Sequence, residues 1–158
     1  MTSLQRAIAT TEEIRDALAS EIVIAREERV LIRNMDLDGL NRRAAKRSEF
    51  NQRTLNLQQT LAVDLAQVGQ DTGLATVTLD GLMERAPALG QRMSAVLAEV
   101  RAMASALSEL DHLNRLLGQR ALSYVRAHLA VISPKPSAYD RRGGSATGDR
   151  ASTVVRVL

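Results

Sequence analysis

Residues 89–131 read LGQRMSAVLAEVRAMASALSELDHLNRLLGQRALSYVRAHLAV, and the architecture of the chain follows from this stretch. Its apolar residues recur at alternating steps of four and three, the periodicity of a long helix that packs against other helices. Pro87 fits the first turn of such a helix, while Pro134 and Pro136 end it. The pattern predicts one helix over residues 87–132, about 67 Å long at 1.5 Å per residue. The predicted seam consists of Leu89, Met93, Val96, Val100, Met103, Leu107, Leu110, Asn114, Leu117, Ala121, Tyr124, His128 and Val131.

Two shorter amphipathic segments precede the long helix. The first is expected over residues 3–34, with Ser3 as its N-cap or, alternatively, a capping box of Thr10 with Glu13, and with an apolar face that Arg29 interrupts. The second is expected over residues 37–68 and is apolar mainly in its second half. The connection between them is rich in Asn, Asp and Gly, which suit a tight turn. So short a connection makes the two helices antiparallel neighbours.

Turn-forming residues separate the second helix from the long one. Gly69 and Gly73 are expected to end the second helix, and Thr78 can cap a short helical turn before Pro87. The predicted fold is therefore all-α: an antiparallel bundle of three long helices, plus a short helical turn, followed by a flexible C-terminal tail.

Composition supports an aliphatic helical core. Of 158 residues, 45% are hydrophobic but only 2% are aromatic, and there is no cysteine. The lack of cysteine excludes disulfides and thiol catalysis, and it fits a reducing compartment. No run approaches the roughly 18 apolar residues of a membrane span. We expect a soluble cytoplasmic protein that does not insert into membranes.

Charge divides the chain into two predicted parts. Residues 1–132 hold 16 basic and 16 acidic side chains, so the net charge of +3 comes from residues 133–158. The change in composition predicts a helical bundle over residues 1–132 and a mobile tail over residues 133–158. The basic cluster Arg42, Arg43, Lys46 and Arg47 forms a polar stripe on the second helix, without aromatic side chains for stacking. We therefore expect no nucleic-acid partner.

The motifs of known catalytic and metal sites are missing from the sequence. Glu109 and His112 have the spacing of half a di-iron site, but residue 125 is Val, so His128 cannot supply the second half. Glu28, flanked by arginines on its own helix, is interpreted as part of a surface ion pair. We expect no metal, no cofactor and no enzymatic activity.

The long helix exceeds its expected partners in length, which leaves part of its seam uncovered. The difference is about 15 to 20 Å at 1.5 Å per residue. An uncovered apolar patch marks a partner site, although a homodimer or a segment that folds back could also cover it. Asn114 is a polar residue on this seam, where it could fix the register of a partner or bond within the bundle. The residues expected to be uncovered are Ala121, Leu122, Tyr124, Val125, Leu129, Val131 and Ile132.

Short motifs near the end of the chain resemble a known family. Leu113-Asn114-Arg115-Leu116-Leu117, followed about 20 residues later by Tyr139-Asp140-Arg141-Arg142-Gly143, is similar to the C-terminal pattern of the FlgN family of flagellar export chaperones. The resemblance covers residues 10–145. The first half is compatible with the family at Glu27, Leu31, Asp36, Leu40 and Lys46.

The resemblance implies a non-enzymatic cytoplasmic chaperone for flagellar type III export. Such a protein binds the C-terminal amphipathic helix of hook-filament junction proteins and delivers them to the cytoplasmic domain of the export gate. By the same resemblance, Tyr139 and Asp140 would contact the export gate. The alternative is a structural or adaptor protein that closes its own seam as a homo-oligomeric coiled coil. The residues expected to bind the client are Asn114, Leu117, Ala121, Tyr124, Val125, His128, Leu129 and Ile132.

Overall fold

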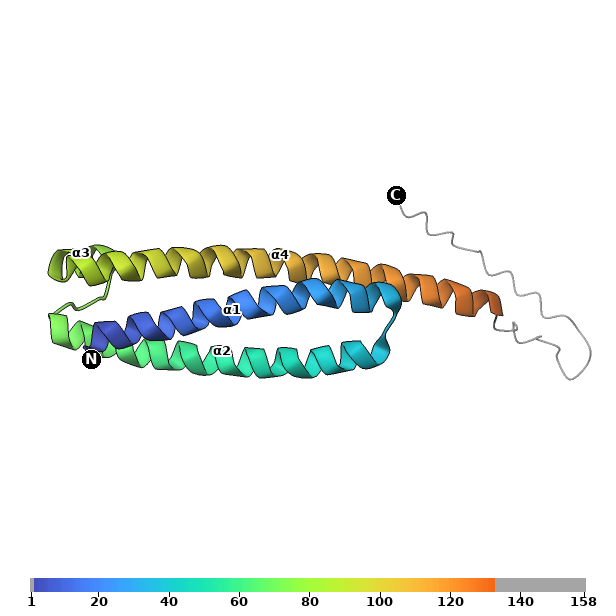
Figure 1. The fold of residues 1–158 in the computed structure, drawn as a ribbon, viewed down its shortest axis with the longest axis horizontal. Helices are drawn as coiled ribbons and strands as arrows, with labels where there is room; N and C mark the ends of the chain where they lie inside the picture. The colour runs from blue at the N-terminus through green and yellow to red at the C-terminus, as the bar shows by residue number, and fades with distance from the viewer. Residues whose placement is uncertain (1, 133–158) are drawn as a thin grey trace, which may run out of the picture. The chain divides into compact units, whose positions relative to one another are not determined.

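The computed structural model describes residues 2–132, which form four helices and no strand. By its contacts the chain divides into two units, Met1–Leu122 and Ser123–Leu158. In the first unit three long helices lie side by side: α1 and α4 run in one direction and α2 runs in the other (Figure 1). This arrangement confirms the predicted all-α antiparallel bundle. The helices are α1, Ser3–Asn34; α2, Leu37–Thr72; α3, Leu79–Arg85; and α4, Pro87–Ile132.

The first helix begins at a capping box. The Thr2 hydroxyl accepts a hydrogen bond from the backbone N–H of Gln5 at 3.2 Å, and the Thr2 N–H donates to Gln5 Oε1 at 2.9 Å. The prediction that Ser3 caps the helix is therefore wrong by one residue. Ser3 lies in the first turn, where its hydroxyl donates instead to Asp71 of α2 at 2.5 Å. This bond ties the start of α1 to the end of α2.

Only Met35 and Asp36 separate α1 from α2. Met35 has a φ of 53°, in the left-handed region, and its N–H donates to the Ile32 carbonyl. A left-handed residue of this kind is a common way for a helix to end. Asp36 then caps α2 by accepting a hydrogen bond from the Gly39 N–H at 2.9 Å. The predicted turn chemistry is confirmed for Asp36, but Met35 rather than Asn or Gly occupies the left-handed position.

The connection from α2 to α4 differs slightly from its prediction. The second helix continues to Thr72, four residues past the predicted end, because Gly69 is tolerated inside it and Gly73 supplies the left-handed end with a φ of 69°. Thr78 caps α3 as predicted and accepts a hydrogen bond from the Gly81 N–H at 3.2 Å. The short helix folds back against the start of α4.

The bundle buries its apolar side chains in two clusters. One joins the start of α1, the end of α2, α3 and the start of α4, and the other lies farther along α1, α2 and α4. At the second cluster the same seams also carry the buried charged and polar residues Glu21, Arg43 and Asn114. The fully buried members are Leu4, Ala7, Ile8, Val68, Leu82 and Met93 in the first cluster, and Ile14, Leu18, Ala25 and Leu107 in the second.

Candidate binding surfaces

A buried ion pair lies at the second apolar cluster. Arg43 of α2 lies between two acids of α1: its Nη2 is 2.5 Å from Glu21 Oε1, and its Nε is 3.1 Å from Glu28 Oε2. The side chains of Arg43 and Glu21 are 6% and 3% exposed. From the sequence, Arg43 belongs to a basic cluster on α2, and Glu28 is interpreted as part of a surface ion pair with an arginine of its own helix. The interpretation of Glu28 is wrong, because Glu28 pairs with Arg43 across the α1–α2 interface.

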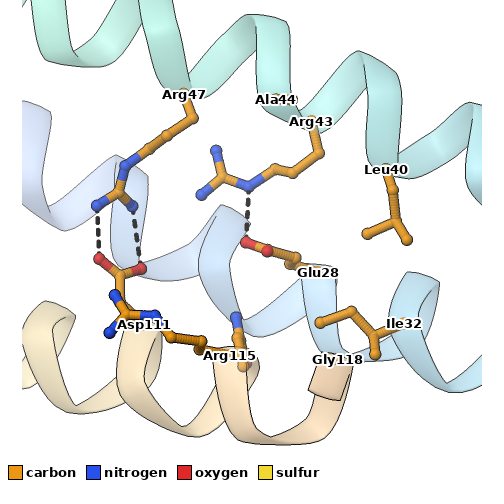
Figure 2. A pocket seen from close by; sticks show the side chains of 10 residues that line it. Glu28, Ile32, Leu40, Arg43, Ala44, Arg47, Asp111, Arg115 and Gly118 are labelled. Atoms are coloured by element: carbon orange, nitrogen blue, oxygen red, sulfur yellow. Dashed lines mark hydrogen bonds and ion pairs between the residues drawn. The ribbon is translucent and has the colours of Figure 1, made fainter. Parts of the chain in front are cut away.

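A second ion pair joins α2 to α4. Arg47 donates to both oxygens of Asp111, at 3.1 and 2.5 Å (Figure 2). It also donates to Glu21 at 2.8 Å. Partial burial acts to lower the pKa of Arg47, but the hydrogen bonds and charges of Asp111 and Glu21 outweigh it, so the net pKa is raised. The guanidinium therefore stays charged and connects all three long helices.

Asn114 occupies the next level of the seam. It is 4% exposed, and its amide donates to the carbonyl of Ala25 at 2.7 Å while its oxygen accepts from Arg29 Nε at 3.0 Å. The two polar residues that interrupt the predicted apolar faces of α1 and α4 thus bond to each other. Of the two roles considered for Asn114, the structure provides the hydrogen bonds within the bundle.

A groove opens beside these polar residues, with a volume of about 450 Å³. At one end Ile32 and Leu40 point toward each other next to Gly118; at the other end lie Arg47 and Asp111 (Figure 2). A Cβ on Gly118 would meet no atom within 4 Å, so packing does not require glycine there. Glycine inside a helix costs about 1 kcal/mol relative to alanine. The lining residues are Glu28, Ile32, Leu40, Arg43, Ala44, Arg47, Asp111, Asn114, Arg115 and Gly118.

The described part of the second unit, residues 123–132, consists of the last turns of α4, and every residue in it is exposed. Tyr124, Leu129 and Ile132 are 57%, 56% and 74% exposed. The His128 ring packs on Tyr124, with ring centroids 4.1 Å apart, and its Nδ1 lies 3.1 Å from the Tyr124 carbonyl oxygen. Helical periodicity places these residues on one side of the helix. We call this surface the apolar α4 face: Tyr124, Val125, His128, Leu129 and Ile132.

The predicted client-binding residues fall into three groups in the structure. Asn114 is buried, and Leu117 and Ala121 are half-buried, whereas the five residues of the apolar α4 face are exposed. Ala121 is thus less exposed than the pattern suggested. The two predicted export-gate residues, Tyr139 and Asp140, lie outside the described residues. The client role of all these positions stays a prediction.

Prediction from the sequence missed the groove and the ion pairs that border it. A signal for them exists: steps of three and four residues along α2 run from Leu40 through Arg43, Arg47, Phe50 and Thr54 without a break. On α1, Glu21 falls between Leu18 and Ala25 in the same way. Charged residues at such positions of both neighbouring helices indicate a buried pair rather than a solvated stripe.

Metal-ligating side chains do not gather in the described part of the chain. His112, half of the Glu109–His112 pair, is exposed on α4. Within residues 2–132, no group of three His, Asp or Glu side chains could hold a metal ion. None of the four helices of this part carries an apolar stretch that could cross a membrane.

The fold defines the class: an all-α protein built on one antiparallel bundle of long helices. A family model described as FlgN protein matches residues 1–147, so the chain belongs to the FlgN family. This finding confirms the resemblance seen in the sequence motifs. Membership implies a flagellar export chaperone in general terms. No curated protein and no solved structure matches the chain.

Proposed function

We propose that this protein is a cytoplasmic chaperone that binds the C-terminal amphipathic helix of hook-filament junction proteins and delivers them to the type III export gate. The observation that carries the proposal is the apolar α4 face, because Tyr124, Leu129 and Ile132 expose more than half of their surface at neighbouring positions of one helix. Large apolar side chains gathered in this way are typical of a surface that binds a partner.

An amphipathic helix is the partner that fits this face best. A helix recognises another helix by placing apolar side chains three and four residues apart against a matching row. Tyr124, Val125 and His128 have this spacing, and Leu129 and Ile132 continue it. Aromatic residues also contribute strongly to interfaces, because a ring contributes a large contact area with few rotatable bonds.

Calorimetric titration tests the client. The C-terminal helical peptide of a hook-filament junction protein is titrated into the full chain and into the variants Tyr124→Asp and Leu129→Asp. We expect one-to-one binding with a negative heat-capacity change, weakened about thirtyfold in each variant, which corresponds to ~2 kcal/mol. Ala130→Asp is the matched control, because it adds the same charge to an exposed site on the opposite side of the helix.

The outcomes separate the chaperone from a structural coiled coil. Equal loss of binding in Ala130→Asp would point to general charge repulsion and count against the proposed face. Light scattering could instead show a stable dimer that Leu129→Asp dissociates and that does not change when the peptide is added. This result would favour the homo-oligomeric alternative. Helical content measured by circular dichroism should stay the same in every variant, because the substituted side chains are exposed.

The delivery step is assigned to Tyr139 and Asp140 on the strength of the family resemblance. The variant Tyr139→Ala should bind the client peptide as tightly as the unaltered protein but bind the cytoplasmic domain of the export gate more weakly. A variant that retains full binding to the gate domain would remove Tyr139 from the delivery step without affecting the client site.

A further inference from the structure

The groove beside α1, α2 and α4 has features that the bundle itself does not need. Gly118 forms part of its wall. A Cβ added to Gly118 would meet no atom within 4 Å, so a larger residue would fit there without a clash. Arg115 also lines it and makes no ion pair with any residue of the described range 2–132. The open space and the unpaired guanidinium of Arg115 point to an occupant that brings both bulk and an acceptor oxygen.

Charge selects the kind of acceptor. The two carboxylates that line the groove are already held, Glu28 by Arg43 and Asp111 by Arg47. Arg43 and Arg47 also share Glu21, so Arg115 is the one guanidinium of the lining that has no carboxylate partner among residues 2–132. A carboxylate is the acceptor that a guanidinium binds best, through two parallel hydrogen bonds. The groove therefore favours an acidic side chain over a neutral or basic one.

Shape selects the rest of the occupant. The apolar end of the groove is formed by Ile32 and Leu40 near Gly118, and the polar end by Arg47 and Asp111, toward which Arg115 extends (Figure 2). Residues three or four apart on a helix lie on the same face, about 5–6 Å from each other. A helix laid in the groove can thus place an apolar side chain at one end and a carboxylate at the other.

We propose that this groove binds the client helix through one acidic side chain, which pairs with Arg115, and one large apolar side chain, which packs against Gly118, Ile32 and Leu40. The groove is formed by residues of the first unit alone. The inference rests on the proposed function for the identity of the client, and it adds the chemistry that the client must carry: an acidic residue one helical turn from a large apolar residue.

Two peptides and two groove variants test the proposal in the full chain. The probes are the C-terminal helical peptide of a hook-filament junction protein and the same peptide with every Asp and Glu changed to its amide. Against the native peptide, Arg115→Glu should lose affinity about tenfold; against the amide peptide it should change less than about twofold. Gly118→Leu, which fills the open wall, should lose about tenfold against both peptides.

A matched control and a folding control make the result decisive. Arg101→Glu makes the same charge change at an exposed site of α4 outside the groove, and it should leave both affinities within about twofold. Gly118→Leu should keep or raise the thermal midpoint, because its Cβ meets no atom and leucine favours a helix.

Each remaining outcome counts against the proposal in a recognisable way. Equal losses in Arg115→Glu and Arg101→Glu would indicate only long-range attraction and overturn the groove. Native and amide peptides that bind the unaltered protein equally well would do the same. If Leu129→Asp weakens peptide binding but neither groove variant does, the proposed role of the groove is overturned and the proposed function is kept. No binding of either peptide to the unaltered protein would overturn the groove and the proposed function together.

Discussion

Toward α3, at what we call the closed end, fully buried apolar side chains form the core and the Arg6–Asp64 ion pair lies beside them. Toward the turn between α1 and α2, at what we call the open end, buried charged and polar residues occupy much of the seam. At the closed end Val68, Leu82 and Met93 are at most 2% exposed. At the other end Arg43, Glu21 and Asn114 occupy the corresponding seam positions, and a groove lies beside them. Apolar side chains reach close packing without a fixed direction, whereas a buried ion pair holds its two groups in one geometry. Hollows lie at both ends, but the one beside Asn114 is lined by three guanidinium groups, those of Arg43, Arg47 and Arg115.

The largest difference between the ends should appear when a buried charge loses its partner. Glu21→Leu should lower the free energy of unfolding by about 3 kcal/mol, because it removes one of the two acids that hold buried Arg43. Urea denaturation measures this loss. Glu12→Ala, which breaks an exposed pair with Arg92, should cost less than about 1 kcal/mol. Similar losses in the two variants would show that the buried ion pair contributes no more to stability than the exposed one.

The double variant Glu21→Leu with Arg43→Met sharpens that result. It replaces both charges by apolar groups of similar length, so most of the stability lost in Glu21→Leu should return. A double variant as unstable as the single one would show that the charges contribute in a way that apolar packing cannot replace.

Two glycines of α4 give the next largest contrast. Gly90→Ala at the closed end puts a Cβ 2.8 Å from Met83 N and 2.9 Å from the Leu82 carbonyl carbon, which are backbone atoms, and should cost about 2 kcal/mol. Gly118→Ala at the open end should instead gain up to about 1 kcal/mol. Thermal unfolding of the two variants measures the difference. A gain in both would mean that α3 can move away from α4 at little cost.

The smallest expected effect concerns pH at the closed end. The hydrogen bond from Ser3, the hydrogen bond from Gln67 and the positive charge of Arg6 hold the pKa of Asp71 below its ordinary value, against a smaller opposing effect of burial. A carboxyl with a lowered folded-state pKa stabilises the protein above its unfolded-state pKa, and this contribution is lost as pH falls through the folded-state pKa. Asp71→Asn should therefore be less stable than the unaltered protein at pH 7.

That difference should shrink as pH falls below the ordinary carboxyl pKa of about 4 and through the lowered pKa of Asp71 in the folded protein. Denaturation curves at several pH values between 7 and 2 measure it. A difference that stays constant over this range would show that the bond from Ser3 acts without help from the charge of Asp71.

The helix ends were the most predictable part of the fold, because proline, glycine and hydroxyl residues impose local backbone constraints. Pro87 begins α4, and Thr78 caps α3, as predicted. The end of α2 was missed by four residues, since Gly69 permits helix and only the left-handed conformation at Gly73 terminates it. Local rules identify the residues that can end a helix but not which of them does so.

The candidate sites were predictable only where one helix determines them. Exposure of Tyr124 and Leu129 followed from the length of the apolar seam in α4. The pairing of Arg43 with Glu21 depends on which residues of two helices meet across an interface, and each helix taken alone shows only a charged residue. The groove is formed by residues of three helices, so the periodicity of a single helix could not predict it.

The two-residue connection at Met35 and Asp36 also affects how the chain folds. The Arg43–Glu28 contact next to this connection closes a loop of 15 residues, whereas the Ser3–Asp71 contact at the far end closes one of 68. The longer loop costs about 1.3 kcal/mol more in chain entropy, if it forms first. We therefore expect the α1–α2 hairpin to form first at its turn and then pair progressively toward α3. The contacts of Arg43 with Glu28 and Glu21 would then form before the apolar cluster at the closed end.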